Sequence, residues 1–88
     1  MANRQIHSIW DNGGETADRY SIYLGGQFWP LNTVNGLRDC LAVNDTPTSP
    51  NMGFSQFCMG QPGPHNGRRI KFSELPLNVQ KHVRRRLS

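Results

Sequence analysis

The chain has 88 residues, of which 35% are hydrophobic, and ten lysines and arginines against six acidic residues give a net charge of +4. A chain of this length builds one small core, so we expect residues 1–88 to form a single domain in which fifteen glycines and prolines make many turns. No apolar run of about eighteen residues is present, which excludes a membrane-spanning helix, and the N-terminus lacks the apolar segment of a secretory signal.

The first half of the chain predicts antiparallel strands. Residues 5–10 alternate between polar and apolar side chains, and residues 20–24 are rich in aromatic and β-branched side chains. Gly25 and Gly26 are typical of a two-residue turn, so residues 27–31 are predicted to complete a hairpin. Residues 37–43 fit a fourth strand or one or two helical turns.

The second half predicts a long loop, a strand and a helix. Residues 44–67 are rich in proline and glycine, which limits regular structure to a short piece at residues 54–59. Residues 68–72 alternate again, and residues 73–76 (SELP) are typical of a helix entry. A helix is predicted over residues 75–87, with apolar side chains spaced four apart on one stripe.

Together these elements predict an α+β fold, in which a small antiparallel sheet of three to five strands packs against one C-terminal helix. A core so small would benefit from assembly into a homo-oligomer. The residues expected in the core are Trp10, Tyr20, Ile22, Tyr23, Phe28, Trp29, Phe72, Val79 and Val83.

The positive charge is concentrated at the C-terminus. Residues 66–88 hold seven lysines and arginines against one glutamate, whereas residues 1–65 hold three arginines against five acidic residues. This distribution favours a phosphate-bearing or acidic-protein partner. A basic, solvated helix that only keeps the protein soluble would show the same pattern.

The cysteines and histidines indicate neither a disulfide framework nor a metal site. Cys40 and Cys58 are expected to be free, buried thiols in a reducing cytoplasm. The three histidines are scattered without the spacing of a zinc site, so we expect no metal and no cofactor.

The segment from Trp10 to Tyr20, WDNGGETADRY, has the densest polar chemistry in the chain. Asn and Gly tolerate positive φ, so a plain turn between two strands explains part of it. The segment is longer than a hairpin turn requires, and surplus polar loops often hold binding sites.

This segment resembles the signature of a family of short phage and prophage proteins. In that family, Trp-Asp-Asn-Gly-Gly-x-Thr-x-Asp-Arg-Tyr is followed by Gly-x-His-x-Gly-x-Arg-Ile-x-Phe, found here at residues 63–72, and by a Leu-Pro helix, here Leu75-Pro76. One departure is Ser21, where the family has Thr. The resemblance implies a phage origin and a compact α+β fold, and little about chemistry. A phage protein without a secretory signal is expected in the cytoplasm of the host cell.

We hypothesise that the two motif segments form a pocket for a small phosphate-bearing nucleotide. Amides of residues 12–14 would surround an anion, arginines would bind phosphate oxygens, and the carboxylates would accept hydrogen bonds from ribose or base. The alternative is that Asp18 pairs with Arg19 or Arg68 and only braces the loop. The expected ligand-binding residues are Asp11, Asn12, Gly13, Gly14, Thr16, Asp18, Arg19, Tyr20, His65, Arg68 and Arg69.

The sequence favours binding over catalysis. His65 stands alone in a loop, and Asp11 and Asp18 lack a motif that would fix them around a metal ion. A phage accessory protein that sequesters an immune-signal nucleotide without turnover fits these observations. The alternative is a basic protein that binds nucleic acid, or a host defence complex as anti-CRISPR proteins do, through the C-terminal helix.

Overall fold

The computed structural model describes residues 5–25 and 36–88. Its five strands are β1 (Ile6–Asp11), β2 (Tyr20–Leu24), β3 (Arg38–Val43), β4 (Ser55–Gly60) and β5 (Arg68–Ile70). They form one antiparallel sheet in the order β4-β3-β2-β1-β5. Two 3₁₀ turns, η2 (Pro64–Asn66) and η3 (Phe72–Glu74), precede the helix α1 (Leu77–Leu87). The predicted α+β class, with an antiparallel sheet and one C-terminal helix, is confirmed.

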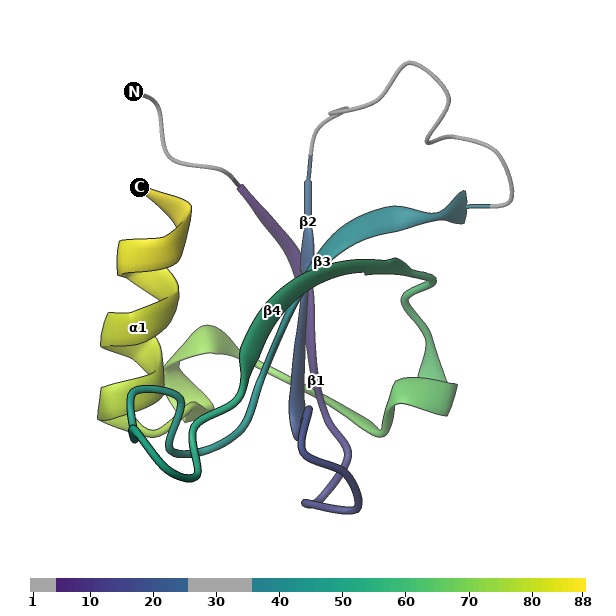
Figure 1. The fold of residues 1–88 in the computed structure, drawn as a ribbon. Helices are drawn as coiled ribbons and strands as arrows, with labels where there is room; N and C mark the ends of the chain where they lie inside the picture. Colours follow the sequence, from purple (N-terminus) through teal and green to yellow (C-terminus); the bar gives the residue numbers. More distant parts are fainter. Residues whose placement is uncertain (1–4, 26–35) are drawn as a thin grey trace.

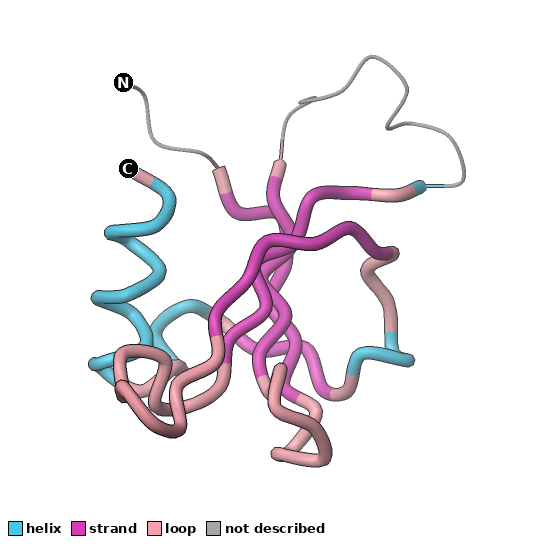
Figure 2. The backbone as a smooth tube through the Cα atoms, viewed as in Figure 1, coloured by secondary structure: helices cyan, strands magenta, loops and turns pink. Residues whose placement is uncertain are grey.

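Helix α1 covers one face of the sheet, and the turn η2 lies on the other side (Figure 1, Figure 2). A row of apolar residues crosses the sheet under the helix, because Ile9 pairs with both Ile70 and Ile22, and Ile22 pairs with Leu41. Val79 and Val83 of α1 are fully buried against this face. The predicted apolar stripe of α1 therefore closes the core over the sheet.

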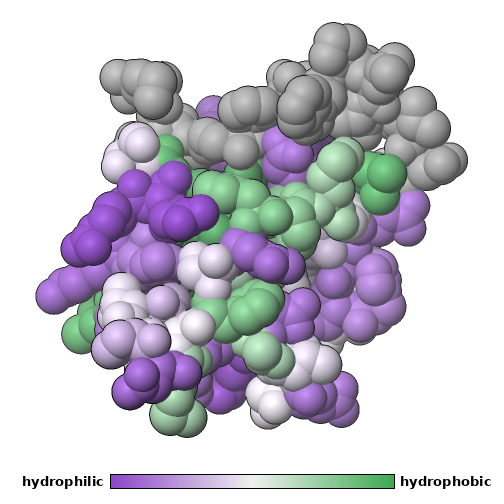
Figure 3. All heavy atoms as spheres, viewed as in Figure 1, coloured by the Kyte–Doolittle hydropathy of each residue, from purple (hydrophilic) through white to green (hydrophobic). Residues whose placement is uncertain are grey.

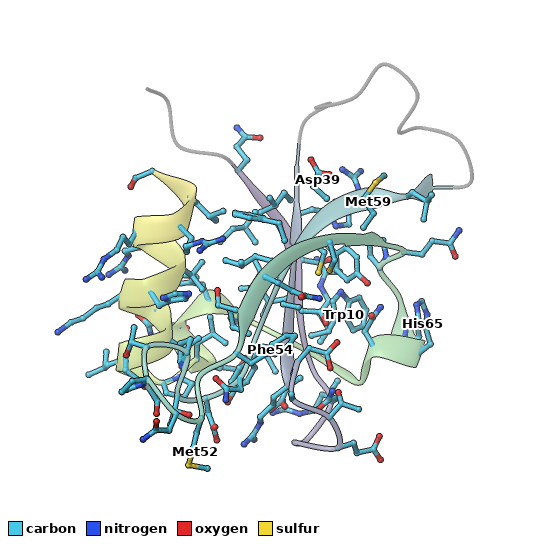
Figure 4. All side chains as sticks on the ribbon, in the orientation of Figure 1. Trp10, Asp39, Met52, Phe54, Met59 and His65 are labelled. Atoms are coloured by element: carbon cyan, nitrogen blue, oxygen red, sulfur yellow. The ribbon has the colours of Figure 1, made fainter. Side chains whose placement is uncertain are left out.

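The prediction that Trp10 lies in the core is wrong. Side chains alternate along a strand, so Trp10 faces away from Ile9 and from α1. Figure 4 shows Trp10 on the same side of the sheet as His65, opposite the helix. Trp10 is half-buried there, and its indole Nε1–H donates to Ser8 Oγ at 3.0 Å. The alternation of residues 5–10 has one slip, and the structure has a register irregularity between Ile6 and Ser8.

The start of the helix and the end of the last strand differ from the prediction. The helix begins at Leu77 because Pro76, with extended ψ, occupies the N-cap position. The last predicted strand ends at Ile70, since residues 72–74 form η3, where the Glu74 carboxylate accepts from the Lys71 amide at 2.7 Å. The fourth strand predicted at residues 37–43 is confirmed, as β3, and its helical alternative is wrong. The predicted strand at 27–31, with Phe28 and Trp29, lies outside the described residues.

The proline- and glycine-rich region contains a full strand. Strand β4 pairs with β3 over six residues and forms one edge of the sheet, so the short regular piece predicted at residues 54–59 is confirmed with a shift of one residue. Its side chains Phe57 and Met59 are 45% and 49% exposed. Figure 3 shows the corresponding hydrophobic area on the surface beside the hydrophilic residues of α1.

Candidate functional site

The loop between β1 and β2 uses its own backbone amides for internal hydrogen bonds. The Gly13 amide donates to Asp11 Oδ1 at 2.8 Å, and the Gly14 and Glu15 amides donate to Asn12 Oδ1 at 2.8 and 3.1 Å. Gly13 and Gly14 have φ of 79° and 89°, which glycine adopts without steric cost. Of the amides predicted to surround an anion, those of Gly13 and Gly14 are therefore already paired with side-chain oxygens.

The other polar groups of the loop also bond within it. Asn12 Nδ2 donates to Thr16 Oγ1 at 2.8 Å and to the Asp18 carbonyl at 3.3 Å, and the Thr16 hydroxyl donates to the Asp18 carboxylate. The Asn12 amide closes the loop with the Arg19 carbonyl at 2.9 Å. Asn12 thus connects both sides of the loop and fixes its shape.

Arg19 is held at the base of the loop by two carboxylates. Its Nε lies 3.0 Å from Asp11 Oδ1, its Nη2 donates to Asp11 Oδ2 at 3.4 Å, and its Nη1 lies 3.4 Å from Asp45 Oδ2. The guanidinium also lies 5.2 Å from the centre of the Tyr20 ring. The loop is braced, as the alternative from the sequence suggests, although Arg19 pairs with Asp11 and Asp45 instead of Asp18.

This pairing controls the ionisation of Asp11. Burial acts to raise the pKa of its carboxyl, but the hydrogen bonds from Arg19 and the Gly13 amide outweigh burial and lower the pKa below its usual value. A lowered pKa stabilises the folded state above the pKa of the unfolded chain, about 3.9, and this contribution is lost as the pH falls through the folded-state pKa.

We therefore expect Asp11→Asn to reduce the free energy of unfolding by about 1 kcal/mol at pH 7, because a charge-assisted hydrogen bond is lost. The deficit relative to the native protein should shrink as the pH falls from about 3.9 toward the folded-state pKa, because Asp11 then takes up a proton in the unfolded chain. Urea unfolding at pH 7 and pH 3 measures both values. Glu15→Gln, at the exposed tip of the same loop, is the control, and an equal pH dependence for the two variants would contradict the assignment.

The sheet separates the remaining predicted ligand residues. Arg68 lies opposite Asp11 in the β1–β5 pairing, and its Nη1 is 3.7 Å from Glu74 Oε1. The next residue, Arg69, faces the other side of the sheet, where its guanidinium lies 6.0 Å from the Trp10 ring centre. His65 is exposed in η2 on that same side (Figure 4). Asp11, Arg19, Tyr20 and Arg68 are brought to one end of the sheet, but Arg69 and His65 are not part of that group.

A second polar surface lies on the last turn of α1 and consists of Arg84, Arg85 and Arg86, which we call the arginine arc. All three side chains are exposed, whereas Val83 and Leu87 on either side of them in sequence are buried. Within residues 5–25 and 36–88, the structure shows no ion pair for any of the three. Their charges also suit the negative end of the helix dipole.

Two aromatic rings flank the arginine arc. The Arg84 guanidinium lies 5.1 Å from the ring centre of Phe72, in η3, and the Arg86 guanidinium lies 4.7 Å from that of Phe57, in β4. The arginine arc therefore reaches across the helix, from Phe57 on the edge strand β4 to Phe72, which follows the opposite edge strand β5. The sequence does not reveal these rings as partners of the arginines, since the β4 pairing that places Phe57 beside α1 is not visible in a proline-rich segment.

Two grooves extend the basic surface from the arginine arc to β5. One has a volume of about 590 Å³ and is lined by Ile6, Phe72, Arg84 and Arg85, among others. The second, about 550 Å³, shares Ile6 and Phe72 and adds Arg69 and Lys71. Glu74 also lines the second groove, but its carboxylate already contacts the Lys71 amide and Arg68.

Two histidines beside this surface have a lowered pKa. Burial and the charges of Arg38 and Arg69 lower the pKa of His7, which lines the second groove. Burial and the charges of Arg86 and Arg85 lower the pKa of His82, whose Nε2 lies 2.7 Å from Ser55 Oγ. Burial is the larger cause of both shifts, and the positive charges of the neighbouring arginines act in the same direction.

The described part of the chain contains no cluster of three or more His, Cys, Asp or Glu side chains that could hold a metal ion. None of its helices is long and apolar enough to cross a lipid bilayer. Comparison of the chain with protein-family models, curated proteins and solved structures found no match.

Proposed function

We propose that this protein binds nucleic acid through the arginine arc and the adjoining basic grooves. The observation that supports this proposal is the group of three exposed arginines at the end of α1 without a carboxylate partner among the described residues. Arginines without a carboxylate partner are free to neutralise phosphates, and this favours binding because it releases the counterions condensed on the nucleic acid.

The flanking aromatic rings favour single-stranded nucleic acid. Proteins that bind single strands combine a basic path for the backbone with aromatic faces on which bases stack. Phe57 is 45% exposed beside Arg86, and Phe72 is half-buried beside Arg84. A strand that crosses the arginine arc would pass a ring at each side of the helix.

The acidic loop between β1 and β2 lies far from the path proposed for the nucleic acid. The β1–β2 loop lies at the end of the sheet opposite the C-terminus of α1 (Figure 1). Asp11 is also paired with Arg19, which offsets part of its charge. Repulsion between this loop and a phosphate backbone on the arginine arc would be weak, because the separation allows screening by salt.

The second candidate function is binding of a small phosphate-bearing nucleotide at the β1–β2 loop. Arg19, whose side chain is 32% exposed, and the two exposed glycines favour it. The ligand would have to replace the hydrogen bonds that Asp11 and Asn12 now make to the loop amides, which costs affinity. For this reason we place nucleic acid first.

Paired variants separate the two functions. We expect Arg84→Ala with Arg85→Ala to weaken binding of a fluorescent single strand of about 20 nucleotides at least roughly tenfold at low salt, measured by anisotropy, because two phosphate contacts are lost. Arg19→Ala should leave that affinity within about twofold. Heat on calorimetric titration with a panel of cyclic and ADP-ribose-type nucleotides, lost in Arg19→Ala and kept in the double variant, would instead support the second candidate.

The biological setting that fits either binding mode is a phage accessory factor that acts on a host defence system by stoichiometric binding. A phage without the gene should plate normally on an undefended host and poorly on a host with the relevant defence. Equal plating on all defended and undefended hosts would argue for a housekeeping role.

A further inference from the structure

Cys40 and Cys58 face each other across the β3–β4 pairing. They are direct partners in the register of the two strands, so their side chains project from the same face of the sheet, the face opposite α1. Both are free thiols, Cys40 buried and Cys58 half-buried on the edge strand. The sequence predicts two buried thiols, but only Cys40 is buried, and the structure places the two side by side.

The separation suits a covalent bond without movement of the backbone. Opposed residues of antiparallel strands have Cα atoms about 4.5 to 5.5 Å apart, within the range of roughly 4.4 to 6.8 Å that disulfides span. The two thiols are close enough to hydrogen-bond, and burial together with the neighbouring Cys58 raises the pKa of Cys40.

The surroundings determine which thiol reacts first. Tyr23 pairs with Cys40 on the β2 side, and its hydroxyl donates to Asn66 Oδ1 at 2.8 Å, which holds the η2 segment near this face. Cys40 is 2% exposed under this cover. Cys58 belongs to the edge strand β4 and is half-buried, so it is the more exposed of the two cysteines.

We propose that Cys40 and Cys58 form a thiol-pair modification site that reacts with a low-molecular-weight disulfide such as oxidised glutathione and closes to an intramolecular disulfide. The Cys58 thiolate attacks one sulfur of the oxidant, forms a mixed disulfide and releases one glutathione, which takes up the proton. The Cys40 sulfur then attacks Cys58 Sγ and releases the second glutathione. Two protein thiols lose two protons and two electrons, and one oxidant molecule is reduced to two thiols.

The bond would fasten the edge strand to the sheet. Strand β4 contacts α1 through Ser55 with His82 and through Phe57 with Arg86, so its position shapes one side of the arginine arc. Because the cross-link restricts the unfolded chain, we expect the oxidised protein to melt on the order of 10 °C higher than the reduced protein. This inference does not depend on nucleic-acid binding.

The test treats the full chain with oxidised glutathione in native buffer and again in urea, and follows the reaction by intact mass spectrometry. The proposal predicts a monomer that has lost two hydrogens, a cross-linked peptide joining Cys40 to Cys58, and closure of the mixed disulfide at least roughly tenfold faster in native buffer, where the strands hold the thiols together. A persistent dithiol, disulfide-linked dimers alone, or closure that is faster in urea would overturn it.

Single variants assign the order of attack. Cys40→Ala should stop at a stable glutathione adduct on Cys58, whereas Cys58→Ala should react slowly or not at all because Cys40 is covered. Circular dichroism checks that each variant is folded. Phenylarsine oxide, which bridges paired thiols, gives an independent measurement: one equivalent should bind to the reduced native protein, and none should bind stably to either variant. Absence of stable binding to the native protein would contradict the pairing.

Discussion

Val83→Asp is expected to leave the protein unfolded at room temperature. Val83 lies on α1 and is fully buried against the sheet, in a cluster that includes Ile22 and Leu41. An aspartate there would be an unpaired charge in an apolar core, or a neutral acid without hydrogen-bond partners, at a cost of several kcal/mol. A domain of 88 residues has a total stability of about 5 to 10 kcal/mol, so this one substitution removes most or all of it.

Leu77→Asp is the matched control, since it places the same acid on the same helix. Leu77 is 72% exposed and lies in the first turn, where a negative charge suits the helix dipole. Far-ultraviolet circular dichroism and urea titration should show a folded Leu77→Asp variant and an unfolded Val83→Asp variant. A cooperative unfolding transition of native midpoint in Val83→Asp would refute the placement of α1 on the sheet. Deletion of residues 75–88 should likewise prevent folding, because the sheet would lose its cover.

Gly67→Ala is expected to reduce the free energy of unfolding by about 3 kcal/mol or more. Gly67 has φ of 113°, and a Cβ there would lie 2.2 Å from the Asp11 carbonyl oxygen and 2.7 Å from Asn12 Cα. These are backbone atoms, so neither can rotate away. The contact joins the start of β5 to the end of β1, and its loss should separate β5 from the sheet.

Gly14→Ala is the control, because it measures the cost of positive φ without a steric clash. Gly14 has φ of 89°, and a Cβ added there would meet no atom within 4 Å, so alanine at this position should cost only about 1 to 2 kcal/mol. Urea unfolding of the two variants gives the comparison. Equal losses in the two variants would show that β5 does not approach β1 as closely as the structure indicates.

The sheet and helix can be predicted because their signals are local. The four-residue spacing of Val79, Val83 and Leu87 predicts a buried stripe whatever it packs against, and all three are buried. The helix start at Leu77 cannot be predicted, because Pro76 is compatible with either the first turn or the N-cap. Hydrophobicity alone predicts that Trp10 lies in the core. The register of strand β1 decides which face of the sheet Trp10 occupies, and the irregularity between Ile6 and Ser8 hides that register in the sequence.

The candidate site is harder to predict, since it depends on contacts between distant segments. The loop residues stand out as chemically dense, yet the sequence cannot show that Asp11 and Asn12 bind the loop amides themselves. The pairing of Arg19 with Asp45 joins residues 26 apart in sequence. Charge alone anticipates the arginine arc, whereas its contacts with Phe57 and Phe72 follow from the packing of β4 and η3 beside α1.

The salt dependence of single-strand binding tests the proposed function most directly. The logarithm of the association constant for a strand of about 20 nucleotides should fall linearly with the logarithm of salt concentration, and the slope should become shallower by about 1.4 in the Arg84→Ala, Arg85→Ala double variant, as expected for two lost phosphate contacts. Arg19→Ala should keep the native slope. Identical slopes for the native protein and the double variant, or no measurable binding by the native protein at low salt, would contradict the proposal that the arginine arc binds nucleic acid.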